Sequence, residues 1–230
     1  MRLLNILLSV RPWLLTAGLA FVVSVDVSKE VSADSLAQRA SVLPLEVSLQ
    51  RTEGQSRRHF TERCSAFFVG HNNKDAVLIS AWHCIDGQLS FQRQPVVSVQ
   101  GQRIEVTIID SGHTMDKDWL LMKAPSVAFS SLVPIEISRR PVDVDESLVA
   151  IGWGRQSDLS DAKPTMVECP VTHVKPSLSL RCGLAKGDSG GVVARRIENG
   201  QLEAVGVISS GDSVATTLAY PLSRLPKIFD

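Results

Sequence analysis

The sequence predicts an all-β protein, and three observations support this class. Runs of apolar and β-branched residues recur about every 8 to 15 residues, close to the spacing of strands in sandwiches and barrels. Turn-forming residues separate the runs, as in Gly70-His71-Asn72-Asn73 and Glu198-Asn199-Gly200. Almost no long segment shows the 3.6-residue period of an amphipathic helix. Together these features favour a β-barrel or a β-sandwich.

The expected strands follow one another along most of the chain, with one proline-rich interruption. Residues 124–141 contain three prolines and read as a crossover. The expected strands cover residues 66–69, 76–81, 95–99, 104–109, 119–122, 148–153, 165–174, 191–194, 203–209 and 216–220.

The composition gives no sign of a strongly charged partner. The 230 residues include 24 basic and 24 acidic side chains, and 44% are apolar. This balance gives no reason to expect nucleic acid or an anionic membrane as a partner. The sequence shows no low-complexity segment and no internal repeat, and it is long enough for one domain or two small barrels.

The N-terminus has the features of a signal peptide over residues 1–33. Arg2 and Arg11 form a basic region, and residues 13–25 form an apolar stretch. Val31-Ser32-Ala33 then offers small residues at the spacing that a signal peptidase reads. We therefore expect a secreted or periplasmic protein, without stable membrane association after cleavage.

An uncleaved membrane anchor over residues 3–25 is the alternative. Asn5, Arg11 and Pro12 interrupt that span. The uninterrupted part is shorter than the roughly 20 residues that a bilayer requires, so cleavage is favoured. In both cases the rest of the chain lies outside the cytosol.

Three local motifs place a histidine, an aspartate and a serine in that order along the chain. They are Ala81-Trp82-His83-Cys84, Asp118-Trp119-Leu120-Leu121 and Gly187-Asp188-Ser189-Gly190-Gly191. A serine hydroxyl needs an imidazole to accept its proton and an acid to orient that imidazole. From residue 44 to residue 220 the chain resembles the chymotrypsin/trypsin-like serine peptidases, in a compact form of bacterial type.

Chain order excludes two other serine hydrolase classes. The pentapeptide at 187–191 also satisfies the G-x-S-x-G pattern of α/β-hydrolases, which need a histidine after the serine. All five histidines precede Ser189. The subtilisin order would need an acid motif before His83, and none is evident.

The resemblance implies a specific architecture. It predicts two six-stranded antiparallel β-barrels with the active site in the cleft between them. Residues 34–130 would form the N-terminal barrel, which begins with the strand at 44–50 and carries the histidine and the aspartate. Residues 131–230 would form the C-terminal barrel, which starts near 151–154 and carries the serine.

The resemblance also implies the catalytic roles. Ser189 would be the nucleophile, His83 the general base and then the general acid, and Asp118 the residue that orients His83. The backbone N–H groups of Gly187 and Ser189 would form the oxyanion hole. Asp116 competes with Asp118, because residues two apart share one side of a strand, but the apolar run directly after Asp118 favours Asp118.

Four cysteines agree with an oxidising compartment. The resemblance implies a disulfide between Cys64 and Cys84, which leaves Cys169 and Cys182 for a second one. Zinc is not expected, because no C-x-x-C or H-x-x-x-H spacing occurs. The implied chemistry needs no cofactor.

The specificity pocket is expected to lack an acidic base. By resemblance the base lies six residues before the serine, at Gly183, and the walls come from Ser209, Ser210 and Gly211, with Thr217 and Leu218. A pocket of this kind predicts a preference for apolar or small residues over Arg and Lys. Asp212 is the one nearby acid that could bring charge to the rim.

No activation switch by an inserted new N-terminus is expected. Cleavage after Arg39 would leave only four residues before Pro44, and an extended segment of that length reaches roughly 14 Å. The family has about twelve residues there, which reach about 40 Å, so the new N-terminus of this chain would be too short to insert. Asp188, the residue before the serine, therefore needs another partner, and Arg155 is the candidate.

Two functions from different classes are compatible with these motifs. The first is a serine endopeptidase that hydrolyses protein or peptide substrates through an acyl-enzyme. The second is a catalytically silent homologue that serves as a binding module. Silent homologues usually lack a member of the triad, and none is missing here, which favours the enzyme.

Overall fold

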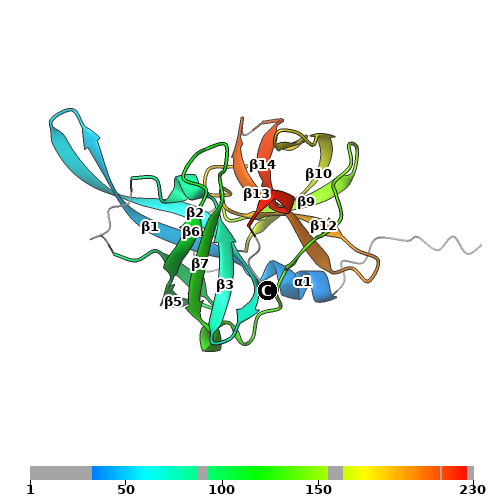
Figure 1. Cartoon of the computed structure of the whole chain (residues 1–230), viewed down its shortest axis with the longest axis horizontal. Helices are drawn as coiled ribbons and strands as arrows, with labels where there is room; N and C mark the ends of the chain where they lie inside the picture. Colours follow the sequence, from blue (N-terminus) through cyan, green and yellow to red (C-terminus); the bar gives the residue numbers. More distant parts are fainter. Residues whose placement is uncertain (1–32, 88–92, 155–162, 213, 227–230) are drawn as a thin grey trace, which may run out of the picture. The chain divides into compact units, whose positions relative to one another are not determined.

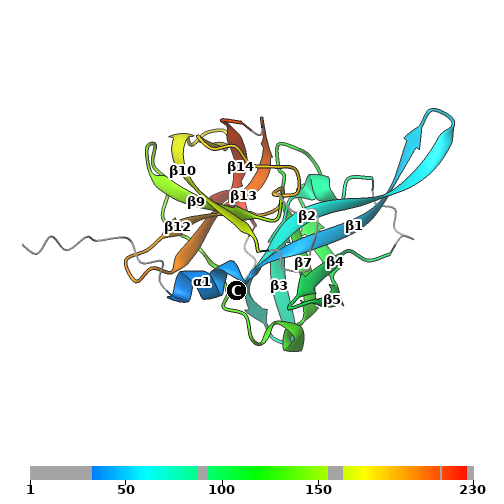
Figure 2. The ribbon, with the colours of Figure 1, turned by 180° about the vertical axis from the view of Figure 1, so that it is seen from behind.

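A computed structural model describes residues 33–87, 93–154, 163–212 and 214–226. These residues are arranged mainly as strands in two sheets (Figure 1, and from the opposite side in Figure 2), so the predicted all-β class is confirmed. Most of the predicted signal peptide lies outside the described residues. Within the described part of the chain, no helix has both the length and the apolar character needed to cross a membrane.

The first sheet is a curled half-barrel of seven strand segments in the order β5-β4-β1-β2-β3-β7-β6. Only Val106 separates β5 from β6, although they lie at opposite edges of the sheet, so one bent stretch of chain supplies both edges. The strands are β1 (Val42–Glu53), β2 (Ser56–Asn72), β3 (Asp75–Ser80), β4 (Val96–Val99), β5 (Gln102–Glu105), β6 (Thr107–Ser111) and β7 (Leu120–Pro125).

The second sheet closes on itself as a six-stranded antiparallel barrel. Its strands follow the order β12-β9-β10-β11-β14-β13, and β12 also pairs with β13. The short β8 (Glu136–Ile137) adds a parallel strand outside β13. The barrel strands are β9 (Ser147–Gly152), β10 (Thr165–His173), β11 (Leu178–Leu180), β12 (Val192–Arg196), β13 (Leu202–Gly211) and β14 (Thr217–Pro221).

Alternation of apolar and polar residues positions the first strand. Leu45, Val47 and Leu49 are fully buried, whereas the intervening residues are partly exposed, as expected for side chains that alternate across a strand. The main apolar core also includes residues of the second sheet, such as Ile151 and Val207. The two sheets therefore pack on each other through a common core.

Every expected strand is present, but several features were not predicted. β1 and β2 form a long hairpin that continues through the mostly polar residues 51–63. The prediction missed this part of the hairpin because it depended on apolar runs, which are absent there. The expected strand 104–109 is interrupted at Val106, and the strand expected at 119–122 begins at Leu120. β8 and β11 are too short to show a period.

A short N-terminal helix, α1 (Ala33–Arg39), packs against the second sheet through Gln38. The buried Gln38 side chain exchanges two hydrogen bonds with the main chain of Leu202 and donates another to the carbonyl of Pro134. Arg39 donates to the carbonyl of Pro164. The residues directly before β1 are therefore fixed to the body of the protein.

A buried ion pair ties the crossover segment to the second barrel. Arg195 on β12 is only 5% exposed. Its guanidinium donates to both carboxylate oxygens of Glu146, to Ser138 Oγ at 2.9 Å and to the Pro141 carbonyl at 2.8 Å. The hydrogen bond from Arg195 lowers the pKa of Glu146, and the same bond raises the pKa of Arg195.

We expect Glu146→Gln to lower the free energy of unfolding by about 3 kcal/mol at pH 7, because it leaves a buried guanidinium without its counter-ion. A carboxylate whose pKa is lowered by folding stabilises the fold at pH values above its ordinary pKa of 4.5. This contribution is lost as the pH falls below 4.5 and the carboxylate becomes protonated. Urea unfolding at several pH values measures both effects.

The exposed Glu105 provides the matched control. Glu105→Gln should change stability little at any pH. An equal loss in both variants, or a Glu146→Gln deficit that persists at acidic pH, would show that the pairing with Arg195 is not the cause.

Candidate active site

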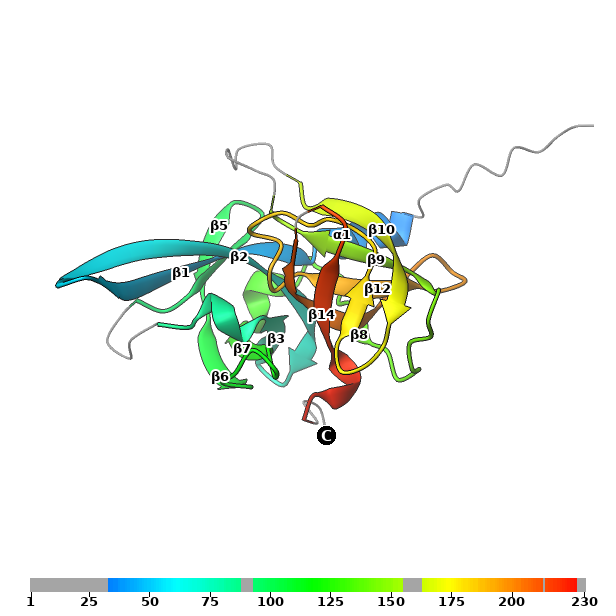
Figure 3. The ribbon, with the colours of Figure 1, turned by 90° about the horizontal axis from the view of Figure 1, so that it is seen from above.

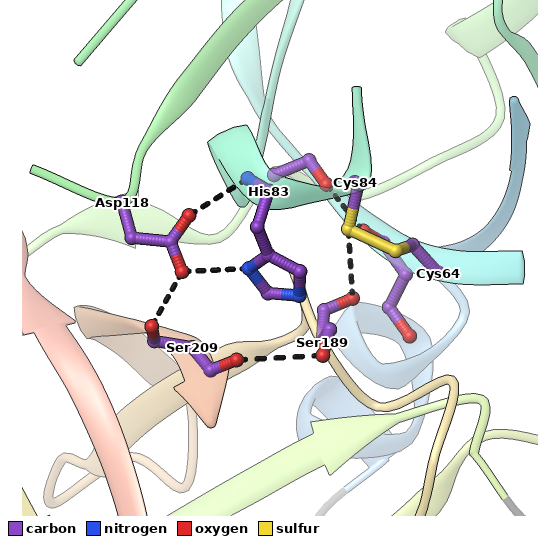
Figure 4. A network of polar contacts seen from close by, with 8 residues as sticks. Cys64, His83, Cys84, Asp118, Ser189 and Ser209 are labelled. Carbon is purple, nitrogen blue, oxygen red and sulfur yellow. Dashed lines mark hydrogen bonds and ion pairs between the residues drawn. A yellow bond between two sulfur atoms is a disulfide. The ribbon is translucent and has the colours of Figure 1, made fainter. Parts of the chain in front are cut away.

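Four segments converge where the two sheets meet, and each contributes one polar side chain (Figure 4). His83 lies in the 3-10 turn η1 (Trp82–Cys84) directly after β3, and Asp118 lies just before β7. Ser189 lies in the glycine-rich loop before β12, and Ser209 lies on β13. The structure thus brings together the three residues predicted as a triad.

Asp118 is fully buried and fixes the orientation of His83. Its Oδ2 lies 2.8 Å from His83 Nδ1, and its Oδ1 accepts from the backbone N–H of His83 at 2.9 Å. Ser209 Oγ donates a third hydrogen bond to Oδ2. Because a carboxylate only accepts, Nδ1 carries the proton and Nε2 remains available as a base.

The competing aspartate occupies a different environment. Asp116 is exposed, in a turn closed by a bridge between Thr114 and Lys117. Asp116 and Asp118 do not lie in a strand, so the rule that residues two apart in a strand share one side does not apply to them. Asp118 accepts the hydrogen bonds that His83 donates.

The Ser189 hydroxyl makes no hydrogen bond to the imidazole in this structure. It donates to the Ser209 carbonyl at 3.4 Å, a long hydrogen bond. No hydrogen bond joins Ser189 Oγ to His83 Nε2, although Figure 4 shows the two groups facing each other. One side-chain torsion sets the direction of the hydroxyl, and such bonds are often long in free enzymes and shorten in the complex with substrate.

Two backbone N–H groups of the loop that carries Ser189 have no acceptor among the described residues. In this loop the N–H groups of Asp188, Gly190 and Gly191 donate to carbonyl oxygens. Within the described parts of the chain, those of Gly187 and Ser189 donate to none. They are the two amides predicted to bind an oxyanion.

Glycine is required twice in this loop. Gly187 and Gly190 have φ angles of +98° and +80°, which favour glycine. A Cβ on Gly190 would lie 2.2 Å from the Ser65 carbonyl oxygen and from Ser80 Oγ. The loop can approach β2 and β3 closely only because it has no side chain there.

Ser65 on β2 connects the first sheet to this loop, and the sequence analysis missed it. Its N–H donates to the Ser189 carbonyl at 2.7 Å, and its hydroxyl donates to the Gly187 carbonyl at 2.8 Å. The same hydroxyl accepts from the N–H of Trp153 at 2.9 Å, and Ser80 Oγ donates to the Ser65 carbonyl. Ser65 is fully buried, so all its polar groups are satisfied by protein.

Asp188 is buried against the start of the second barrel. Its carboxylate accepts from the backbone N–H groups of Gly154 and Ala185, both at 2.7 Å. A Cβ on Gly152 or Gly154 would lie within 2.6 Å of the Asp188 side chain. The predicted partner Arg155 lies outside the described residues, so that pairing remains a prediction.

A pocket of about 370 Å³ opens beside Ser189. Ser209, Ser210 and Gly211 line it, as predicted for the walls, and its described lining contains no acidic residue. Gly183 is not among the lining residues, and Thr217 donates to the Cys182 carbonyl instead of lining the pocket. The lining residues are His83, Met115, Leu184, Ala185, Lys186, Ser189, Ile208, Ser209, Ser210 and Gly211.

Asp212 is not among the residues that line this pocket. It is fully exposed, and its Oδ1 accepts from the N–H groups of Val214, Ala215 and Thr216. These bonds lower its pKa to about 2. Asp212 therefore stabilises its own turn.

Both predicted disulfides are confirmed. Cys64–Cys84 joins β2 to the histidine turn, and Cys169–Cys182 joins β10 to the segment after β11. The sulfur atoms of the first pair lie within 4.8 Å of a His83 ring nitrogen, but bonded sulfur atoms are not the thiolates that bind zinc. Two disulfides indicate a location outside the cytosol.

Comparison with known proteins identifies the class. The family model described as Trypsin matches residues 34–223, so the chain belongs to the trypsin family. It is a serine endopeptidase with a trypsin-like fold. A search of curated proteins found no match.

Solved structures of bacterial and extremophile proteases share the fold. The active form of the Rv3671c protease from M. tuberculosis is 16% identical, with a TM-score of 0.58 over 81% of this chain and 78% of its own. The thermostable serine protease AL20 from an extremophilic microorganism is 14% identical, with a TM-score of 0.59 over 80% and 92%. The serine endoprotease from Yersinia pestis is 17% identical, with a TM-score of 0.57 over 81% and 60%.

We expect Ser65→Ala to lower kcat by about tenfold with little change in KM. The substitution leaves the Gly187 carbonyl without its buried donor, a cost of about 1–3 kcal/mol. The N–H of Gly187, which is predicted to bind the oxyanion, then loses its fixed position. Steady-state kinetics and the affinity for a peptide boronate, which mimics the tetrahedral intermediate, measure the effect.

Ser80→Ala is the matched control, because it removes a buried hydroxyl from the same cluster without removing a bond to the loop. Equal losses of kcat and boronate affinity in the two variants would refute a specific positioning role for Ser65.

Proposed function

We propose that Ser189, His83 and Asp118 are the catalytic triad and that hydrolysis passes through an acyl-enzyme. The observation that carries this proposal is the pairing of buried Asp118 with His83, which faces Ser189. Beside it lie the backbone amides of Gly187 and Ser189, which have no acceptor among the described residues. A silent binding module would have no need of this combination.

The chemistry follows from these positions. His83 Nε2 takes the proton of Ser189 Oγ as that oxygen attacks the substrate carbonyl carbon. The carbonyl oxygen gains the negative charge and accepts hydrogen bonds from the N–H groups of Gly187 and Ser189, each worth about 2.7–4 kcal/mol by analogy with other proteases. His83 then gives the proton to the leaving amine as the peptide bond breaks, and a water molecule repeats the cycle on the ester.

The pocket supports a preference for an apolar or small residue before the cleaved bond. Leu184, Ala185 and Ile208 contribute apolar residues, and the described lining includes the cation of Lys186 but no carboxylate. A substrate Arg or Lys would find no counter-ion there, which is costly for a buried charge. Cleavage-site profiling on a peptide library measures this preference.

We also propose that the mature protein begins after Ala33 and needs no activating cut. Helix α1 is already attached to the second barrel through Gln38, and Asp188 already accepts two backbone hydrogen bonds. Export through the signal peptide would deliver the enzyme to the oxidising compartment where its disulfides form.

A fluorophosphonate probe tests the central proposal. We expect covalent labelling at Ser189 in the folded protein, because only an activated serine reacts with such a probe. Ser189→Ala should abolish both the labelling and peptide hydrolysis.

Ser210→Ala is the matched control, since it replaces a pocket serine that has no place in the triad. Labelling that persists in Ser189→Ala, or a folded wild-type protein that neither reacts nor hydrolyses peptides, would favour the silent binding module.

A further inference from the structure

The hairpin of β1 and β2 continues beyond the first sheet as a two-stranded ribbon, here residues 50–63 (Figures 1 and 3). β4 pairs with β1 only at Leu45 and Glu46, and β3 pairs with β2 only from Phe67 onward. The strands of the ribbon therefore pair with each other alone among the described strands, through Glu53 and Ser56. Such a ribbon adds little to the core, so its surface needs another explanation.

One face of the ribbon is exposed and basic. Along β2, Arg57, His59, Thr61 and Arg63 are exposed on one face. On the other face Arg58 is also exposed, whereas Phe60 and Glu62 are half-buried. Strand side chains two apart share a face. The exposed face therefore carries two arginines and a histidine in one row.

This row leads to the glycine-rich loop at residues 187–191, which carries Ser189 and is here called the nucleophile loop. Ser65 is the next residue of the row after Arg63, and its hydroxyl bonds the Gly187 carbonyl. Lys186, the residue before Gly187, lines the pocket with a side chain that is 90% exposed. The basic row therefore ends beside this loop, and Lys186 lies directly before it.

Acidic groups nearby offset part of this charge. Glu46 stands opposite Arg63 but is paired with Arg103 at 2.7 Å. Glu62 lies on the other face, 4.0 Å from Lys186, at the limit of an ion pair. The chain as a whole has no net charge, so the basic character is local.

The geometry of the reaction decides which part of a substrate meets this surface. The pocket at Ser209–Gly211 takes the residue before the cleaved bond, and the leaving amine must lie against His83, which protonates it. His83 is joined through Cys84 to Cys64 on β2. Residues after the cleaved bond therefore emerge beside β2.

We propose that Arg57 and Arg63, with Lys186, select substrates that carry acidic residues after the cleaved bond. This inference rests on the proposed function. An extended peptide repeats on one face every two residues, about 6.7 Å, which matches the basic row. Along β2, Arg63 lies two residues from Ser65, or about 7 Å, and Arg57 lies eight residues from it, or about 26 Å. The basic row can therefore contact a leaving segment over this range of distances from the nucleophile loop.

Two matched peptides test the proposal. Both carry the same sequence up to the cleaved bond, and the leaving segment has Glu at its second, fourth and sixth positions in one and Gln in the other. We expect kcat/KM to be about five- to tenfold higher for the Glu peptide at low salt, as for a few exposed ion pairs. The ratio should approach one at 1 M salt, where the Debye length is about 3 Å.

Variants assign the effect to the ribbon. In Arg57→Gln/Arg63→Gln the ratio should fall to about twofold, and Arg57→Glu/Arg63→Glu should bring it below one. The control Arg139→Gln/Arg181→Gln removes the same charge from exposed positions of the second barrel and should keep the wild-type ratio. Fluorophosphonate labelling of each variant reports whether the centre is intact.

Three results would overturn the proposal. The first is a wild-type ratio near one in protein that labels at Ser189. The second is a ratio that survives both ribbon variants. The third is ribbon-dependent binding to phosphatidylglycerol vesicles without peptide selectivity, which would assign the surface to a membrane. Absence of labelling in the wild type would instead count against the proposed function.

Discussion

The arrangement of the site depends on one buried carboxylate. Asp118 accepts hydrogen bonds from the backbone and ring of His83 and from Ser209, so it joins the end of β3, the start of β7 and strand β13. A carboxylate without water is stable only if such donors satisfy it. The same bonds that make its burial tolerable therefore fix His83 relative to the second barrel.

Close backbone contact provides the second constraint. The nucleophile loop lies against Ser65 and Ser80 at Gly190, and against Gly152 and Gly154 at Asp188. Because glycines remove side chains at these contacts, main-chain hydrogen bonds position the loop from both sheets. Among the described residues, the amides of Gly187 and Ser189 have no acceptor. The proposed oxyanion hole would need donors held in place in this way.

The sequence predicted features that leave a local pattern and missed those that depend on tertiary contacts. Apolar periodicity identified the strands, and the motif around Ser189 identified the residues that converge. Ser65 and Ser209 were not recognised as parts of the hydrogen-bond network, because a serine in an apolar run shows no sign of what its hydroxyl contacts. Gly183 was assigned by counting residues back from the serine, which cannot follow the path of a loop.

The most direct test of this account compares the two neighbouring aspartates. We predict that Asp118→Asn lowers kcat by about 10⁴-fold, as expected when the orienting carboxylate of a serine–histidine pair is replaced. Asp116→Asn should retain wild-type kcat, because Asp116 is exposed in a turn. Wild-type kcat in Asp118→Asn, or an equal loss in Asp116→Asn, would contradict the account.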